Sequence, residues 1–197
     1  MACELTPHMT IDELVLLAEI LPKNATILEF GCGGSTQFFY EHGAEKIISI
    51  DSDKGWLEKL LTNPIVSTYY KYGKWLPLYV DIGRVRSWGA PCTKTPRPCW
   101  LNYHQHCWRL FSERDFDLIL VDGRFRVACV CQTLLRCGGT DLLFAIHDFR
   151  DRPEYHVLLE FIDVINQVDT LGIFKAKAAI DWRKLAVVIQ DHQFVYV

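Results

Sequence analysis

The segment at residues 27–39, ILEFGCGGSTQFF, restricts the fold of this chain more than any other part of the sequence. Its first residues are mostly apolar, which predicts a short buried strand at 26–30. Three glycines follow, and they allow positive φ angles and let the backbone approach a ligand closely. Ser35 or Thr36 then caps a helix, whose free N–H groups form an anion site. The segment therefore predicts a strand, a glycine turn and a helix, arranged to bind a ligand.

The alternation of strands and helices continues along the chain. Thr10 and Glu13 form a capping box that predicts a helix at 10–21, with its apolar residues on one face. Helices are also predicted at 35–42, 53–62, 99–111, 125–136 (closed by Gly138 and Gly139) and 153–166. Strands are predicted at 46–51, between 65 and 82, at 116–123 and 141–149, and in a terminal hairpin of 171–177 and 184–190. The expected fold is a Rossmann-like three-layer sandwich, with a seven-stranded, mostly parallel sheet and a C-terminal antiparallel hairpin.

Length and composition predict a single domain. A chain of 197 residues, of which 50% are hydrophobic, is long enough to bury a core. We expect one domain over 1–197, in which residues 1–25 form an N-terminal helical extension. Residues 83–98 contain glycine and proline and show no period, which predicts a surface loop. Loops of this length are often functional, and we expect this one to cover the active site.

Charge and the N-terminal sequence disfavour several classes of partner. Lysine and arginine number 21 against 24 aspartates and glutamates, so the net charge of −3 provides no basic field for nucleic acid. The N-terminus lacks the basic and apolar regions of a signal peptide, and no apolar run approaches the roughly 20 residues of a membrane span. We therefore expect a cytoplasmic protein with no nucleic-acid partner, no membrane span and reduced cysteines.

The glycine turn and the end of the second strand predict the kind of cofactor. The dinucleotide fingerprint G-x-G-x-x-G is not met, because Thr36 stands where its last glycine should be. Asp51 ends the second strand, where it can accept two hydrogen bonds from a ribose diol or cap the next helix, and the two roles are compatible. Glu29, the turn G-C-G-G-S and Asp51 together resemble the first two motifs of class I S-adenosylmethionine-dependent methyltransferases.

This resemblance implies S-adenosylmethionine as the cofactor, with its methionine half on the glycine turn and its ribose on Asp51. The residues it assigns to cofactor binding are Glu29, Gly31, Gly33, Ser35, Asp51, Asp81 and Asp122. The segment YVDIGRVRSWGAP at 79–91 resembles a loop of small methyltransferases that act on sugars and other hydroxyl substrates. There, Asp81 would border the adenosine and Trp88 would lie near it, facing the substrate. In the alternative interpretation, Asp81 caps a turn and Trp88 covers the core.

Two further strands each end in an acid, in VDGRFR at 121–126 and IHDFRDRPEY at 146–155. The usual methyltransferase order makes these strands neighbours, so Asp122, His147 and Asp148 can converge as the catalytic residues. The pattern resembles metal-assisted O-methyltransferases, which implies Mg²⁺ or Mn²⁺ held by Asp122 and Asp148. His147 as a general base is the other way to activate a hydroxyl.

The arginines beside these acids have two interpretations. Arg124 and Arg126 follow the first of the two strands and are suited to bind an anionic part of the acceptor. Alternatively, each carboxylate caps a helix or pairs with Arg124, Arg126 or Arg152.

The expected function is therefore S-adenosylmethionine-dependent O-methylation, with a sugar or glycan hydroxyl as the favoured acceptor. The alternatives are O-methylation of another hydroxyl metabolite, a non-catalytic nucleotide-binding module of a glycan-assembly protein, and an NAD-dependent oxidoreductase. A zinc site is disfavoured, because the Cys and His residues at 92–107 include no C-x-x-C pair.

Overall fold

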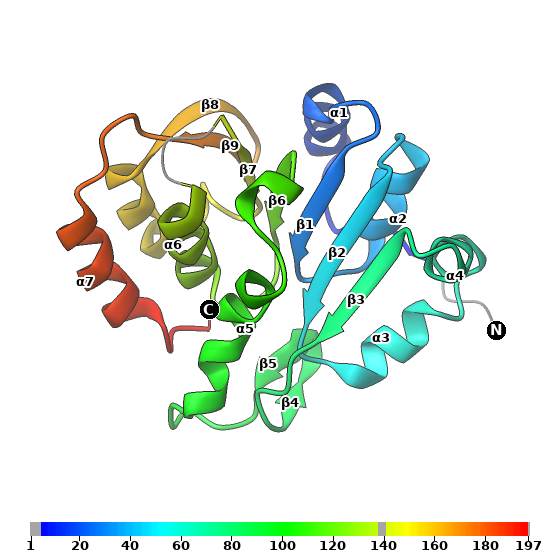
Figure 1. Ribbon diagram of the computed structural model, residues 1–197, viewed down its shortest axis with the longest axis horizontal. Helices are drawn as coiled ribbons and strands as arrows, with labels where there is room; N and C mark the ends of the chain where they lie inside the picture. The colour runs from blue at the N-terminus through cyan, green and yellow to red at the C-terminus, as the bar shows by residue number, and fades with distance from the viewer. Residues whose placement is uncertain (1–4, 138–140, 197) are drawn as a thin grey trace.

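A computed structural model describes residues 5–137 and 141–196 (Figure 1). Its main sheet has seven strands in the order β3-β2-β1-β6-β7-β9-β8. Strands β3, β2, β1, β6 and β7 are parallel, and β9 is antiparallel to both of its neighbours. The strands are β1 (Thr26–Phe30), β2 (Lys46–Asp51), β3 (Trp75–Tyr79), β6 (Leu118–Val121), β7 (Leu143–Ile146), β8 (Ile162–Val168) and β9 (Leu171–Ala176). The predicted seven-stranded, mostly parallel Rossmann-like sheet is confirmed.

Helices cover both faces of the sheet and enclose two cores. One core contains Trp100, Phe125 and Leu185, and the other contains Leu17 and Phe39. Alternate residues of the central strands contribute to opposite cores, as the period of a strand requires. The α-helices are α1 (Ile11–Ile20), α2 (Gly34–Glu41), α3 (Lys54–Leu60), α4 (Pro64–Lys71), α5 (Leu101–Gln105), α6 (Arg126–Cys137) and α7 (Trp182–His192). Together with the sheet they form the expected three layers.

The capping box predicted for α1 is present. The Thr10 side chain accepts a hydrogen bond from the Glu13 backbone N–H at 3.2 Å, and a Glu13 carboxylate oxygen accepts one from the Thr10 N–H at 2.8 Å. The apolar face predicted for this helix consists of Ile11, Leu14, Val15, Ala18 and Leu21, but it is not the buried face. Ile11 and Val15 are exposed, while Glu13 and Leu16 are buried. The reason is that the Glu13 carboxylate finds polar partners inside the protein, as described below.

The prediction of a third strand between 65 and 82 is wrong in its first half. Residues 64–71 form α4, and only residues 75–79 pair with β2. The side chain of Asn63 accepts hydrogen bonds from the N–H groups of Ile65 and Val66, and Pro64 occupies the first turn of the helix. These helix-start signals outweigh the aromatic and β-branched content of the segment.

The C-terminal predictions also need correction. The predicted helix at 153–166 is a 3₁₀ helix, η5 (Pro153–Glu160), followed by β8. The predicted strand at 184–190 lies inside α7, whose N-cap Asp181 accepts hydrogen bonds from two backbone N–H groups. The antiparallel hairpin is therefore β8–β9. The predicted total of seven strands is correct, but β8 takes the place of the strand predicted at 184–190.

Two other segments are more irregular or more ordered than expected. The predicted helix at 99–111 is divided into η2 (Pro98–Trp100), α5 and η3 (Cys107–Arg109). The predicted loop at 83–98 contains a short antiparallel pair, β4 (Val85–Arg86) and β5 (Ala90–Pro91), joined by η1 (Ser87–Gly89). The predicted closure of α6 at Gly138 and Gly139 lies outside the described residues.

Two further findings concern the described residues alone. None of the helices within 5–137 and 141–196 has the length and apolar character needed to cross a membrane. The seven cysteines in these ranges are free thiols, as expected.

Candidate active site

One cavity of about 970 Å³ collects most of the predicted site residues. It lies where β1, β2, β6 and β7 end, at the edge where parallel sheets bind ligands. The N-terminal half of the chain contributes the segment 5–9, the glycine turn 31–35, residues 51–53 and Trp56 to its walls. The remaining lining residues are 87–89, Tyr103, 122–124, Arg126, His147, Asp148 and Arg152.

Two glycines of the turn, Gly31 and Gly34, are required by close backbone contacts. Gly31 has φ +85°, and a Cβ atom there would lie 2.6 Å from Cα of Gly123 in the turn after β6. A Cβ atom on Gly34 would lie 2.2 Å from the backbone nitrogen of Pro7. The turn thus fits between the end of β6 and the N-terminal segment, and any larger residue would displace one of them.

Asp51 faces the cavity from the end of β2. Its carboxylate accepts hydrogen bonds from the backbone N–H groups of Asp53 at 2.8 Å and Cys32 at 3.4 Å. Burial raises the pKa of Asp51, while these hydrogen bonds oppose the rise. The cap of α3 is Asp53, which accepts from the Trp56 N–H. Asp51 is therefore not needed as a cap.

The two predicted residues of the 79–91 segment occupy different environments. Asp81 is exposed, lies outside the cavity lining, and accepts a hydrogen bond from the Gly83 N–H at 2.8 Å, so it caps a turn. Trp88 lines the cavity with 70% of its surface exposed, and its ring contacts His8 edge-on at 4.9 Å. Its carbonyl oxygen accepts a hydrogen bond from Nε of Arg124 at 3.0 Å. Trp88 therefore does not cover the core.

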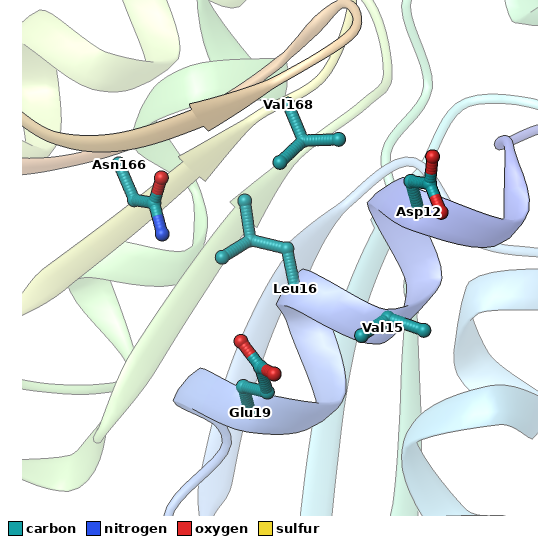
Figure 2. Close-up of a pocket in the computed structure, with 6 residues that line it drawn as sticks. All are labelled: Asp12, Val15, Leu16, Glu19, Asn166 and Val168. Atoms are coloured by element: carbon teal, nitrogen blue, oxygen red, sulfur yellow. The ribbon is translucent and has the colours of Figure 1, made fainter.

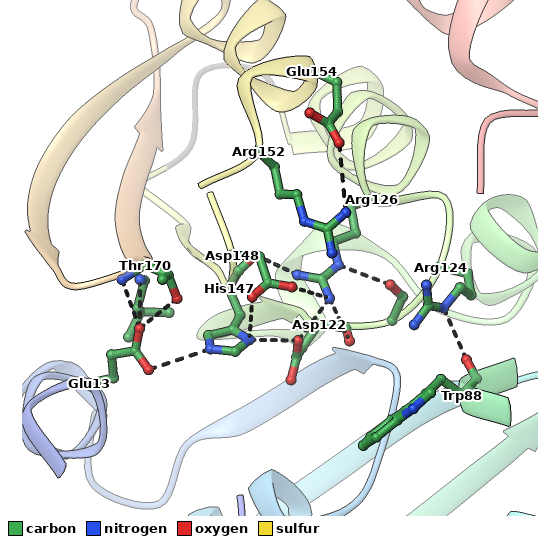
Figure 3. Close-up of polar contacts among 12 residues, drawn as sticks. Glu13, Trp88, Asp122, Arg124, Arg126, His147, Asp148, Arg152, Glu154 and Thr170 are labelled. Carbon is green, nitrogen blue, oxygen red and sulfur yellow. Dashed lines mark hydrogen bonds and ion pairs between the residues drawn. The ribbon is translucent and has the colours of Figure 1, made fainter. Parts of the chain in front are cut away.

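Asp122, His147 and Asp148 do converge, as Figure 3 shows. Nδ1 of His147 lies 3.0 Å from an oxygen of Asp122, and Nε2 lies 3.4 Å from an oxygen of Glu13. Burial lowers the pKa of His147, but the hydrogen bond and charge of Asp122, with Asp148 and Glu13, raise it overall. The imidazole is held between two carboxylates, which favours its protonated form. Both ring nitrogens are therefore engaged by protein carboxylates.

The guanidinium of Arg126 lies between the same carboxylates. Its Nη2 atom is 3.1 Å from an oxygen of Asp122 and 3.1 Å from an oxygen of Asp148. Its other nitrogens donate to the carbonyls of Gly123 and His147. The side chain is committed to protein groups and is not free for an acceptor. Arg124 and Arg152 also line the cavity and have fewer protein partners: Nε of Arg124 donates to the Trp88 carbonyl, and Nη1 of Arg152 lies 3.8 Å from an oxygen of Glu154. The donor set also does not fit a divalent cation, because this guanidinium already bridges the two carboxylates.

No protein-family model and no curated protein sequence matches this chain. A methyltransferase-like protein (spo2022) from Silicibacter pomeroyi DSS-3 has a similar structure, with a TM-score of 0.81 and 22% sequence identity over 98% of each chain. The chain has the class I methyltransferase fold.

Two structures with bound S-adenosylhomocysteine (SAH) share this methyltransferase fold. An O-methyltransferase from Bacillus cereus in complex with SAH has a TM-score of 0.56 and 11% identity over 90% of this chain and 84% of that one. The SAH-bound methyltransferase PaMTH1 from Podospora anserina has a TM-score of 0.52 and 18% identity over 84% and 76%. At these identities the similarity concerns the fold.

Glu29 lies beneath the glycine turn of the methyltransferase fold and does not line the cavity. It is fully buried and accepts hydrogen bonds from the hydroxyls of Ser35, Thr36 and Ser49, the last two at 2.7 Å. It therefore ties β1, β2 and α2 together and positions the turn. Burial raises the pKa of Glu29 to about 7, although the three hydroxyl donors lower it in part.

This pKa predicts a pH dependence of stability. Since the folded-state pKa of about 7 lies above the ordinary 4.5, Glu29 stabilises the fold fully below the lower value, and that contribution is lost as the pH rises through the higher one. The shift corresponds to about 3 kcal/mol. The free energy of unfolding in urea, measured from pH 4.5 to about 7, should fall by about 3 kcal/mol less in Glu29→Gln than in the wild type. The exposed-site control Glu19→Gln should follow the wild type. Parallel curves for wild type and Glu29→Gln would contradict the assignment.

Sequence reasoning missed two contributors to the site. Glu13 was predicted only as a capping residue, yet it is buried, and one oxygen accepts from the Thr170 N–H, the Thr170 hydroxyl and the Leu171 N–H. The segment 5–9 was predicted only as part of an extension, yet it forms a wall of the cavity. Neither has a local signal, because both roles depend on contacts with residues distant in the chain.

A second, smaller cavity of about 290 Å³ lies between α1 and β8 (Figure 2). Its lining residues are Asp12, Val15, Leu16, Glu19, Asn166 and Val168. It contains none of the predicted site residues, and we assign it no role in the chemistry.

Proposed function

We propose that this chain is an S-adenosylmethionine-dependent O-methyltransferase that acts on a sugar or glycan hydroxyl. The observation that carries this proposal is a single cavity that joins the glycine turn and Asp51 to the carboxylates of Asp122 and Asp148. The first pair suits the methionine and ribose of the cofactor, and the second suits a hydroxyl placed in line with its methyl group.

In the proposed reaction, an acceptor oxygen attacks the methyl carbon of the sulfonium. The S–CH₃ bond breaks, the O–CH₃ bond forms, and SAH leaves. The hydroxyl proton must pass to a base, and we assign that base to Asp122. One of its oxygens is engaged by His147 and Arg126, while the other makes no hydrogen bond to any described residue, and the side chain belongs to a residue that lines the cavity. His147 positions this carboxylate instead of acting as the base.

The acceptor end of the cavity supports a polyhydroxylated molecule with an anionic group. Carboxylates accept hydrogen bonds from hydroxyls, and the exposed ring of Trp88 provides a flat apolar surface against which a sugar can pack. Arg124 and Arg152 suit a carboxylate or phosphate. We further propose that the 83–98 segment covers the occupied site, within a single domain over 1–197, and that a small acceptor is favoured over nucleic acid by the net charge of −3.

The test is the release of SAH across a panel of neutral sugars, uronic acids, sugar nucleotides, catechols and transfer RNA. We expect turnover with an anionic sugar derivative. Trp88→Ala should raise the KM for that acceptor at least about tenfold with little change in cofactor affinity. Tyr72→Ala, which removes an exposed aromatic ring outside the cavity, should leave both constants unchanged. Turnover with catechols alone would favour a non-sugar hydroxyl metabolite, and cofactor binding without any turnover would favour a non-catalytic module.

A further inference from the structure

Arg126 is the first residue of α6, and its side chain reaches back to the ends of β6 and β7 (Figure 3). Only 5% of its surface is exposed. The guanidinium contacts one oxygen of Asp122 and one of Asp148, and hydrogen bonds to the carbonyls of Gly123 and His147 fix its plane. These contacts and the burial of the side chain hold the guanidinium in one orientation.

The carboxylates need a cation at this position. The ligand atoms of Asp122, His147 and Asp148 lie within 4.8 Å of one another, the spacing of a metal-ligand set. Two neighbouring carboxylates repel each other, and a positive charge between them offsets this repulsion. Arginine supplies that charge permanently, because its guanidinium does not lose its proton in proteins.

A divalent ion and this guanidinium exclude each other. Mg²⁺ shared by the two carboxylates would sit about 2.0–2.1 Å from the oxygens that Nη2 already contacts, and Mn²⁺ prefers the same kind of oxygen ligands. Nη2 lies 3.1 Å from both oxygens, so the ion would meet the guanidinium in the same space and be repelled by its charge.

We propose that Arg126 is a built-in cation that takes the place of a divalent metal at this centre. The native site then binds no Mg²⁺ or Mn²⁺, and removing the guanidinium converts Asp122, His147 and Asp148 into a metal site. Arg126 is thus a positioning residue that holds both carboxylates charged and oriented. The expectation that turnover needs no metal rests on the proposed function. The expectation that the native centre binds no metal is independent of it.

The test measures Mn²⁺ binding by electron paramagnetic resonance to the wild type, Arg126→Gln and Arg126→Ala. The wild type should bind no Mn²⁺ at this centre. Both variants should gain one site per chain that binds Mn²⁺ at least about tenfold more tightly than any weak binding elsewhere on the wild type, and adding Asp148→Asn should remove this site. Arg114→Ala, which removes an exposed arginine, should resemble the wild type. Circular dichroism verifies that each variant is folded.

Several outcomes would overturn the proposal. The first is Mn²⁺ binding to the wild type that disappears in Asp148→Asn, a result that is decisive even if the Arg126 variants do not fold. The second is a folded Arg126→Gln protein that gains no site. Once an acceptor has been identified, wild-type turnover should also be unaffected by EDTA. A loss of turnover that Mg²⁺ restores would reject the proposal that Arg126 replaces the metal, while leaving the methyltransferase proposal intact.

Discussion

Asp122→Asn should reduce kcat by about 100- to 10,000-fold, the contribution of a positioned general base. Asparagine preserves the size of the side chain but cannot take the hydroxyl proton, and its neutral amide no longer balances the charges of His147 and Arg126. The measurement is SAH release at saturating acceptor, with cofactor affinity determined by calorimetry on the same protein. The loss should appear in kcat, while the Kd for S-adenosylmethionine changes less than about tenfold.

Two variants make this result specific. Asp163→Asn removes an exposed carboxylate on β8 and should behave as the wild type. His147→Asn should retain more activity than Asp122→Asn, because both ring nitrogens of His147 are already engaged by carboxylates. If His147→Asn loses more activity than Asp122→Asn, the histidine is the base and our assignment is wrong.

Asp51→Ala should weaken S-adenosylmethionine binding by about 1.5–3 kcal/mol, the value of a hydrogen bond to a charged group. This is a loss of about 10- to 150-fold in affinity. Asp51 is 8% exposed, faces the cavity and is held by backbone N–H groups, so its carboxylate is oriented before the ribose arrives. Calorimetric titration of S-adenosylmethionine or SAH into the purified variant measures the effect.

Asp81→Ala is the matched control for this experiment. The resemblance of the 79–91 segment assigned Asp81 to the adenosine, whereas the structure has it exposed, outside the cavity, and bonded to the Gly83 N–H. Its removal should leave the affinity within about twofold of the wild type. Equal losses in Asp51→Ala and Asp81→Ala would show that the cavity described here does not hold the ribose as proposed.

Elements with strong local signals could be predicted from the sequence. The capping box at Thr10 and Glu13 begins α1, and the glycine turn joins β1 to α2, as expected. These predictions succeed because a cap or a positive φ angle involves atoms within a few residues of each other. The convergence of Asp122 with His147 and Asp148 was also predictable, because the methyltransferase resemblance implies that the two strands are neighbours, and neighbouring parallel strands end at the same edge of the sheet. The predicted cap of α2 at Ser35 or Thr36 is wrong, because its N-cap is Gly33 and both hydroxyl residues lie inside the helix, where they donate to the buried Glu29.

Predictions that depended on distant partners failed. Residues 162–168 are a strand only because they pair with β9, and Leu185 of the helical segment 184–190 packs into a core built from distant residues. The N-cap of α7, Asp181, is a local signal that the prediction of a strand at 184–190 overlooked. Both segments are rich in β-branched and apolar residues, and such short patterns do not separate helix from strand without their neighbours.

The sequence by itself determined the class of fold, the glycine turn and the acids that follow β2, β6 and β7. Only the tertiary structure decided what those acids contact: a buried Glu13 from α1 on one side of His147, and Arg126 between Asp122 and Asp148 on the other. The physical reason is that the partner of a charge is selected by distance and burial, which residue order along the chain does not specify.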